Sequence, residues 1–198
     1  MAQPKLIDID VADASLTGFA SNVSGAAFTI TTTATSDGLA HQVSIRNDSV
    51  TDHSGKTVAL VGTDADDQAQ TETVTAPVTS ATVESTKYFK TLTSATPSAT
   101  IGADTFDIGW VDEVASKTIM LDRTKGFGAM CQVDVTGTLS YTIQVSISKR
   151  SSYTGQESFA WVATTNTVHV TSTADKIGDI EPQVTAARLL LNSYSSGA

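Results

Sequence analysis

Cysteine is nearly absent from this chain, because Cys131 is the only one among 198 residues. A single thiol cannot form an intrachain disulfide, so this chain lacks the staples on which many small secreted β domains rely. Histidine is also scarce: His41, His53 and His169 lie in separate segments, with no HxH or HxxxH pair among them. A zinc site of the usual ligand spacing is therefore not expected.

Positive charge and long apolar runs are scarce as well. The chain has 12 Lys and Arg against 21 Asp and Glu, which gives a formal net charge of −9. Its densest basic cluster is the pair Lys149–Arg150, so nucleic acid is not expected as a direct partner. No apolar run approaches the roughly 20 residues of a membrane helix, and the first ten residues lack a signal-peptide pattern. We therefore expect synthesis and folding in a cytoplasm, with no membrane partner.

Threonine and serine dominate instead, with 32 and 22 residues. Threonine is β-branched and fits the solvated face of a pleated sheet. Turn signals recur at roughly the 8–12-residue spacing of β-sandwiches and barrels, and no segment has the pattern of a long helix. The fold class we predict is all-β, and a hydrophobic content of 40% favours small cores over one large core.

The expected strands fall into two groups, at residues 1–111 and 112–198. The first group comprises 4–12 (a short strand or an arm), 28–33, 41–46, 57–61, 69–74, 78–83, 88–92 and 103–110, with core anchors at Tyr88, Phe89, Phe106 and Trp110. A connector is expected at 111–116. The second group comprises 118–121, 130–135, 141–148, 159–163, 167–171 and 186–191. Segment 141–148 is the clearest strand, and its alternation predicts a buried face formed by Tyr141, Ile143, Val145 and Ile147.

Two polar clusters contain residue types that carry chemistry elsewhere. Asp52, His53 and Ser54 are those of a catalytic triad, but adjacent residues point in different directions, so we predict a polar turn. The stretch Asp64–Asp67 has three carboxylates, as a Ca²⁺ site requires, but it lacks the glycine and the distal glutamate of an EF-hand loop. An exposed acidic turn is the favoured interpretation, with cation binding left open.

The remaining candidates are also expected to be structural. Cys131 shares a strand face with Val133 and Val135, which predicts a buried structural thiol, and His169 between two valines is expected to face away from the core. The glycines at 102, 109, 126 and 128 match no phosphate-binding loop. Aromatic side chains could form a carbohydrate platform, but we expect core anchors and subunit contacts from Phe106, Trp110, Tyr153, Phe159 and Trp161. No catalytic, cofactor-binding or metal-binding residue is predicted.

One series of segments is informative when taken together: residues 37–45, 52–58, 61–74, 84–94, 102–110, 137–146, Trp161 and 186–193. The series covers roughly residues 15–195 and contains no catalytic signature. It resembles small β-rich structural proteins of tailed bacteriophages. The resemblance implies a virion component built from two small antiparallel β-sandwich modules, immunoglobulin-like or jelly-roll-like.

The function implied first is that of a non-enzymatic capsid decoration, or cement, protein on the virion. Its expected partners are the major capsid protein or other virion proteins and further copies of itself, with a trimer favoured. The first alternative function is that of a head–tail connector, collar or tail subunit. The second alternative is a host-surface glycan-binding module. Similar chains usually add a strand after the segment equivalent to 186–191, so we expect an open sheet edge here, with residues 6–11 as a candidate arm.

Overall fold

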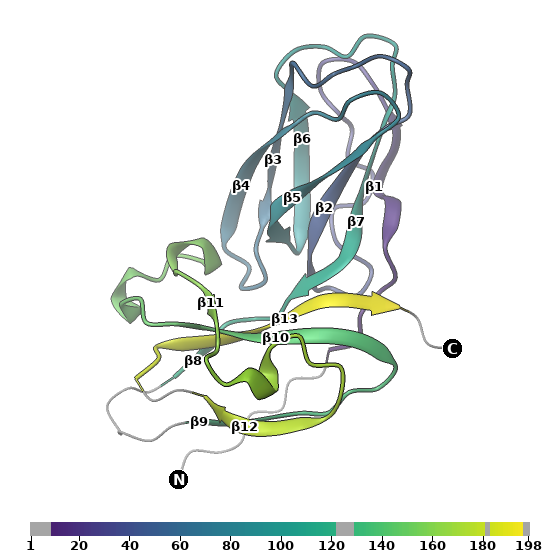
Figure 1. The fold of residues 1–198 in the computed structure, drawn as a ribbon. Helices are drawn as coiled ribbons and strands as arrows, with labels where there is room; N and C mark the ends of the chain where they lie inside the picture. The colour runs from purple at the N-terminus through teal and green to yellow at the C-terminus, as the bar shows by residue number, and fades with distance from the viewer. Residues whose placement is uncertain (1–8, 122–128, 181–182, 196–198) are drawn as a thin grey trace.

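The computed structural model describes residues 9–121, 129–180 and 183–195. Throughout these residues the sheets are antiparallel, and the only helical segments described are three short 3₁₀ turns: η2 (Arg150–Ser152), η3 (Gln156–Ser158) and η4 (Thr167–His169). The predicted all-β fold class is confirmed. Figure 1 shows two groups of strands, one standing on the other.

The upper group has two facing layers of strands (Figure 1). One layer is the sheet β4 (Ala69–Thr75), β3 (Thr57–Thr63) and β6 (Thr91–Pro97). The other contains β5 (Thr82–Phe89), β2 (Ala40–Asn47), β7 (Phe106–Ala115) and β1 (Ser15–Val23). Apolar side chains from both layers form one buried cluster, which includes Phe19, Val43, Leu60, Leu92, Phe106, Ile108 and Trp110. Burial of these side chains supplies the main stabilisation of this group.

Strand β7 continues where the sequence predicts a connector. Val114 and Ala115 are fully buried and pair with β2 on one side and with β13 (Ala186–Ser195) on the other. The polar pair Asp112–Glu113 interrupts the apolar alternation and makes the segment resemble a loop, but both carboxylates accept hydrogen bonds, from Ala14 N–H and the Tyr88 hydroxyl. The connector prediction is therefore wrong, and β7 belongs to both groups of strands. The division at residues 111 and 112 stays a prediction.

The lower group is built around the long pair β10 (Thr138–Ser146) and β13. The short strands β8 (Ile119–Met120) and β11 (Val162–Ala163) flank this pair, and a separate two-stranded sheet, β9 (Ala129–Val133) with β12 (Lys176–Ile180), lies beneath it (Figure 1). A second buried cluster fills the space between them and includes Val11, Tyr141, Ile143, Val145, Ile180 and Leu191.

Two expectations for this lower group change. Tyr141, Ile143 and Val145 are buried as predicted, but Ile147 is 72% exposed because β10 ends at Ser146. The last strand, β13, pairs with β10 on one side and with β8 and β7 on the other; the described strands of this sheet with one partner are β11, β5, β1 and β8. Ile9 and Val11 of the candidate arm pack against the second cluster of the same molecule. The first residues of that arm, 6–8, lie outside the described residues.

Other strand predictions also need correction. Strand β1 was not expected, since Ser15–Val23 shows no apolar alternation; its pairing with β7 holds it in place. Segment 28–33 makes one isolated bridge, from Phe28 to Ala95, and segment 159–163 is a strand only at its last two residues. Segment 167–171 starts as the 3₁₀ turn η4, because the Asn166 side chain accepts the Val168 N–H and bends the chain.

Candidate functional site at the joint between the two groups of strands

The acidic stretch lies at the turn between β3 and β4, where it touches the lower group. Asp64 is 2% exposed, and its Oδ1 accepts the N–H groups of Asp66 and Gln68, both at 2.9 Å. Its Oδ2 accepts the N–H of Gln156 at 2.7 Å, from the start of η3 in the lower group. The expected exposed turn is therefore wrong for Asp64, whose carboxylate is a buried link between distant segments.

The next two aspartates make further links to the lower group. Asp66 accepts the Thr118 N–H at 2.9 Å and the hydroxyl of Tyr153, whose pKa is raised by burial and by this carboxylate. Asp67 pairs with Lys90 and, at 3.4 Å, with Lys117, and the hydrogen bond from Lys90 is the largest influence holding its pKa below the ordinary value. Each carboxylate oxygen of Asp64 and Asp66 already accepts a hydrogen bond, which makes the pair poor ligands for a cation.

Gln156 is the central residue of this joint. It is 4% exposed, and its backbone N–H donates to Asp64 while its side-chain Nε2 donates to the carbonyl of Ser116 at 2.8 Å. Its Oε1 accepts Nη1 of Arg188, from β13, at 2.7 Å. One buried amide thus connects β13, the segment after β7 and the acidic turn. The backbone N–H, the Nε2 and the Oε1 of Gln156 are all paired, as a buried polar group must be if it is to stabilise a fold.

Arg188 is the most buried cation of the joint. Its residue is 9% exposed, and its guanidinium carbon lies 4.7 Å from the ring centre of Trp161 and 5.6 Å from that of Tyr88. Its Nε donates to Oε1 of Gln144 at 2.8 Å. Burial lowers the pKa of Arg188 to about 10, which leaves it charged at neutral pH. The two aromatic contacts and two amide oxygens fix the guanidinium in one orientation.

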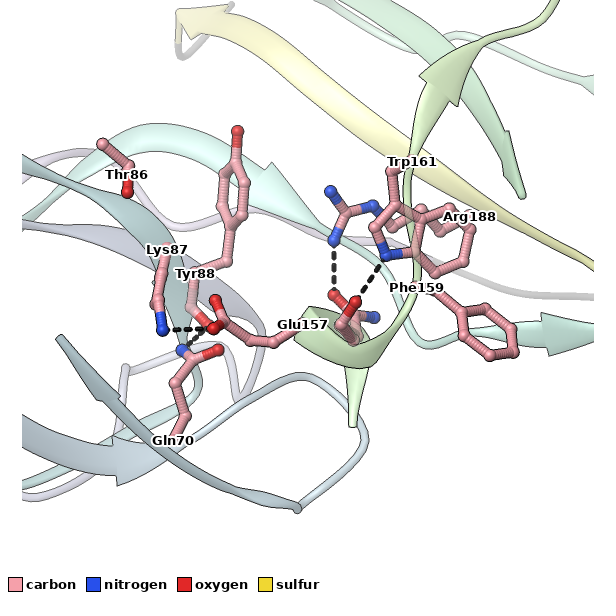
Figure 2. A pocket seen from close by; sticks show the side chains of 9 residues that line it. Gln70, Thr86, Lys87, Tyr88, Glu157, Phe159, Trp161 and Arg188 are labelled. Atoms are coloured by element: carbon pink, nitrogen blue, oxygen red, sulfur yellow. Dashed lines mark hydrogen bonds and ion pairs between the residues drawn. The ribbon is translucent and has the colours of Figure 1, made fainter. Parts of the chain in front are cut away.

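A hollow with a cavity volume of about 230 Å³ opens beside this guanidinium. Figure 2 shows its walls: β4 and β5 on one side, and the loop after β10 with Arg188 on the other. The lining side chains are Gln70, Thr86, Lys87, Tyr88, Gln156, Glu157, Phe159, Trp161 and Arg188. Lys87 and Glu157 form an ion pair across the opening between the two groups of strands. This hollow is the candidate functional site.

No family model, no curated protein and no solved structure matches this chain. Among the residues that the structure describes, no group of three or more His, Cys, Asp or Glu could hold a metal ion. The same residues include no helix with the length and hydrophobicity needed to cross a membrane.

The aromatic candidates separate into two sets. Phe106 and Trp110 are buried in the upper core, as predicted, and the Trp110 indole donates to the Asp13 carbonyl at 3.1 Å. Tyr153, Phe159 and Trp161 lie together in the loop after β10, where Phe159 is buried and stacks edge-on against Tyr153. Phe89 is a core anchor as expected. Tyr88 is not, because neighbouring strand residues face opposite ways, and its ring lines the hollow.

The predicted polar turn at residues 52–54 is confirmed. Asp52 accepts the Ser54 N–H at 2.8 Å, and the Ser54 side chain is exposed. His53 is buried and contacts Asp104 and Lys56, each at 3.0 Å. The three side chains do not form a hydrogen-bonded chain from serine to histidine to aspartate, so the geometry lacks the arrangement of a triad.

His169 and Cys131 lie close to the second core. The expectation that His169 faces away from the core is wrong: it is fully buried, with its ring beside Tyr141, because η4 turns this segment inward. Cys131 is partly buried against the second cluster, and burial raises the pKa of its thiol. A raised pKa lowers the thiolate fraction, which agrees with a structural role.

Sequence reasoning missed a buried contact between the side chains of His41 and Asp37. Asp37 Oδ2 lies 2.8 Å from His41 Nε2, and His41 Nδ1 lies 2.7 Å from the Val111 carbonyl oxygen. Each ring nitrogen of His41 therefore faces an oxygen that can accept a hydrogen bond. Burial raises the pKa of Asp37, but hydrogen bonds from His41, Ala12 and Leu39 outweigh it and bring that pKa down to about 2.

The lowered pKa of Asp37 predicts a loss of stability in acid. The folded-state pKa of Asp37 lies below the ordinary 3.8, so its contribution is complete above that pH and disappears as the pH falls toward 2. Asp37→Asn should therefore lower the free energy of unfolding by about 1–2 kcal/mol at neutral pH and by much less near pH 2. Urea unfolding at several pH values measures this difference, with Asp179→Asn as an exposed control. A difference that stays constant with pH would contradict the assignment.

Proposed function

We propose that this protein is a non-enzymatic structural component of a tailed-bacteriophage virion, and in the first place a capsid decoration protein that stabilises the head. The proposal starts from the resemblance described above. The observation that carries it is the joint, where Asp64, Gln156 and Arg188 hold two groups of strands in one fixed arrangement. A protein that clamps neighbouring capsomers must keep its own shape under load, and a paired buried network supports that requirement.

The surface composition supports the same proposal. Polar Thr and Ser side chains are abundant, and polar, water-bridged contacts are compatible with stable interfaces. On a capsid, many weak contacts of this kind add up through multivalency. We further propose that the two groups of strands are two β-sandwich modules, immunoglobulin-like or jelly-roll-like. We also propose that copies of the chain associate, as a trimer in the first place, beside the major capsid protein.

Two other functions remain as alternatives. A head–tail connector, collar or tail subunit would use the same rigid body in a closed ring, with one heterologous interface per neighbour. A host-surface glycan-binding module would need exposed aromatic rings. Of the five aromatic candidates, Phe106, Trp110 and Phe159 are buried, so this alternative depends on the half-buried Tyr153 and Trp161.

Copy number in purified virions separates these proposals. Quantitative mass spectrometry would compare this protein with the major capsid protein in particles from which loosely bound protein has been washed away. A decoration protein is expected at hundreds of copies, in a simple ratio to capsomers, whereas a ring component would give about 6 or 12. Complete absence from washed particles would reject the virion proposal.

A further inference from the structure

No acidic side chain among the described residues forms a direct ion pair with Arg188; the carboxylates of Asp66 and Asp64 act on its charge only at longer range. The ion pairs among the described residues do not include it, and its two strong hydrogen bonds go to the neutral amides of Gln144 and Gln156. Amide oxygens orient a guanidinium without cancelling its charge. A buried cation without a counter-ion is costly, and native proteins normally pair such charges.

One donor group of Arg188, which lines the hollow, has no partner among the described residues. Nε and Nη1 are used by the two glutamines, and Nη2 donates to no residue that the structure describes. Figure 2 shows this end of the guanidinium pointing into the space between the Tyr88 and Trp161 side chains. The rings contact the guanidinium and hold it in place, so that its open end is fixed before any ligand arrives.

The only acidic side chain that lines the hollow is held elsewhere. Glu157 is exposed and pairs with Lys87 at the mouth. The acid-bearing residues Asp64 and Asp66 use their oxygens within the joint, as described above. A direct ionic contact to Arg188 would therefore have to come from a molecule other than the described part of this chain.

We propose that this hollow is a binding site for a small carboxylate. A carboxylate oxygen would accept from Nη2, in a charge-assisted hydrogen bond that is stronger than one to a neutral acceptor. The flat rings of Tyr88 and Trp161 would flank an apolar or ring-shaped body attached to the acid. A volume of about 230 Å³ is smaller than a drug-sized pocket and suits a small organic acid. This inference does not depend on the virion proposal.

Occupancy of the site would stabilise the joint. The hollow is lined by β4 and β5 of the upper group and by η3, β13 and the loop after β10 of the lower group. A ligand that binds only the folded arrangement raises the stability of the whole chain in proportion to the logarithm of its concentration above Kd. Carboxylate binding would thus be visible as a higher unfolding temperature.

The first test is a titration of the wild-type protein with sodium acetate and sodium benzoate at constant ionic strength, set with sodium chloride. Tryptophan fluorescence reports binding, because Trp161 lines the hollow, and thermal unfolding gives an independent signal. Acetamide and benzamide have nearly the same shapes without the charge. We expect saturable binding of the acids, with benzoate tighter than acetate, and none by the amides. Equal responses to acids and amides, or binding of inorganic phosphate alone, would overturn the proposal.

Two variants locate the site. Arg188→Gln should weaken benzoate binding at least about tenfold, since it removes the charge-assisted bond, whereas Arg46→Gln removes an exposed arginine in β2 and should leave binding unchanged. Glu157→Gln releases Lys87 toward the ligand and should tighten binding about threefold. If Arg188→Gln does not fold, Glu157→Gln decides, because unchanged or weaker binding in that variant would contradict a site at this hollow.

Discussion

Replacing Asp64 with alanine is expected to lower the free energy of unfolding by about 3 kcal/mol or more. The carboxylate accepts three backbone N–H groups, from Asp66, Gln68 and Gln156, and is 2% exposed. Alanine would leave these donors without an acceptor in a place that water reaches poorly. An unpaired buried donor costs about 1–3 kcal/mol, so several together are a large part of the stability of an ordinary domain.

The matched control for this variant is Asp52→Ala. Asp52 is an exposed turn aspartate that accepts one backbone N–H, that of Ser54, and water can replace it. We expect its removal to cost less than about 1 kcal/mol. Urea unfolding followed by circular dichroism compares the two variants. Equal losses of unfolding free energy in the two variants would mean that the hydrogen bond from the Gln156 N–H to Asp64 adds no stability beyond that of an exposed turn.

Hydrogen exchange adds a residue-level measurement to the Asp64 experiment. The Gln156 N–H donates to Asp64 Oδ2, and η3 holds it within the joint. In Asp64→Ala this amide should exchange at least about tenfold faster, while amides in the centre of β2 and β7 change less, because local opening precedes global unfolding. Asp64→Asn is a smaller change, because the asparagine keeps one side-chain oxygen as an acceptor. With its amide nitrogen at the position of Oδ2, it would place a donor opposite the Gln156 N–H, which is also a donor.

The sequence predicts those parts of this fold that depend on short-range alternation. Tyr141, Ile143 and Val145 are buried because three successive inward positions of one strand are apolar. The same pattern extends to Ile147, which is exposed, since the strand ends one residue earlier. Pairing partners determine where a strand stops, and they come from other parts of the chain. Strand β1 shows this limit too: its sequence has no alternation, and its partner β7 begins more than 80 residues later.

The candidate site could not be predicted for the same reason. Asp64 and Gln156 are 92 residues apart, and Arg188 and Gln156 are 32 apart. Asp64 was visible as one carboxylate of an acidic turn, and Arg188 as one residue of an apolar strand. Neither position indicates a buried polar network, because burial of polar groups follows from tertiary contacts. A lone arginine among apolar strand residues was the one available signal, since an inward-facing charge requires a partner.

Replacing Gly109 with alanine is the second change expected to have a large effect. Gly109 lies in the middle of β7, where the irregularly paired strand β1 approaches closely: an added Cβ would lie 1.8 Å from the Ser15 carbonyl oxygen and 2.5 Å from the Leu16 carbonyl carbon. Both contacts are with backbone, so no side chain can move aside, and β1 itself would have to shift. We expect a loss of about 3 kcal/mol or more, at the upper end of what overpacking costs.

The control for Gly109→Ala is Gly55→Ala, at an exposed turn where an added Cβ has nothing within 4 Å and the backbone needs no left-handed conformation. This change should be nearly neutral, or slightly stabilising, because alanine restricts the unfolded chain. Urea unfolding measures the loss, and hydrogen exchange of the β1 amides locates it. If Gly109→Ala has the stability of Gly55→Ala, and the β1 amides keep their protection from hydrogen exchange, then β1 does not pair with β7 as described. The arrangement that brings Asp13 to the Trp110 indole would then need revision as well.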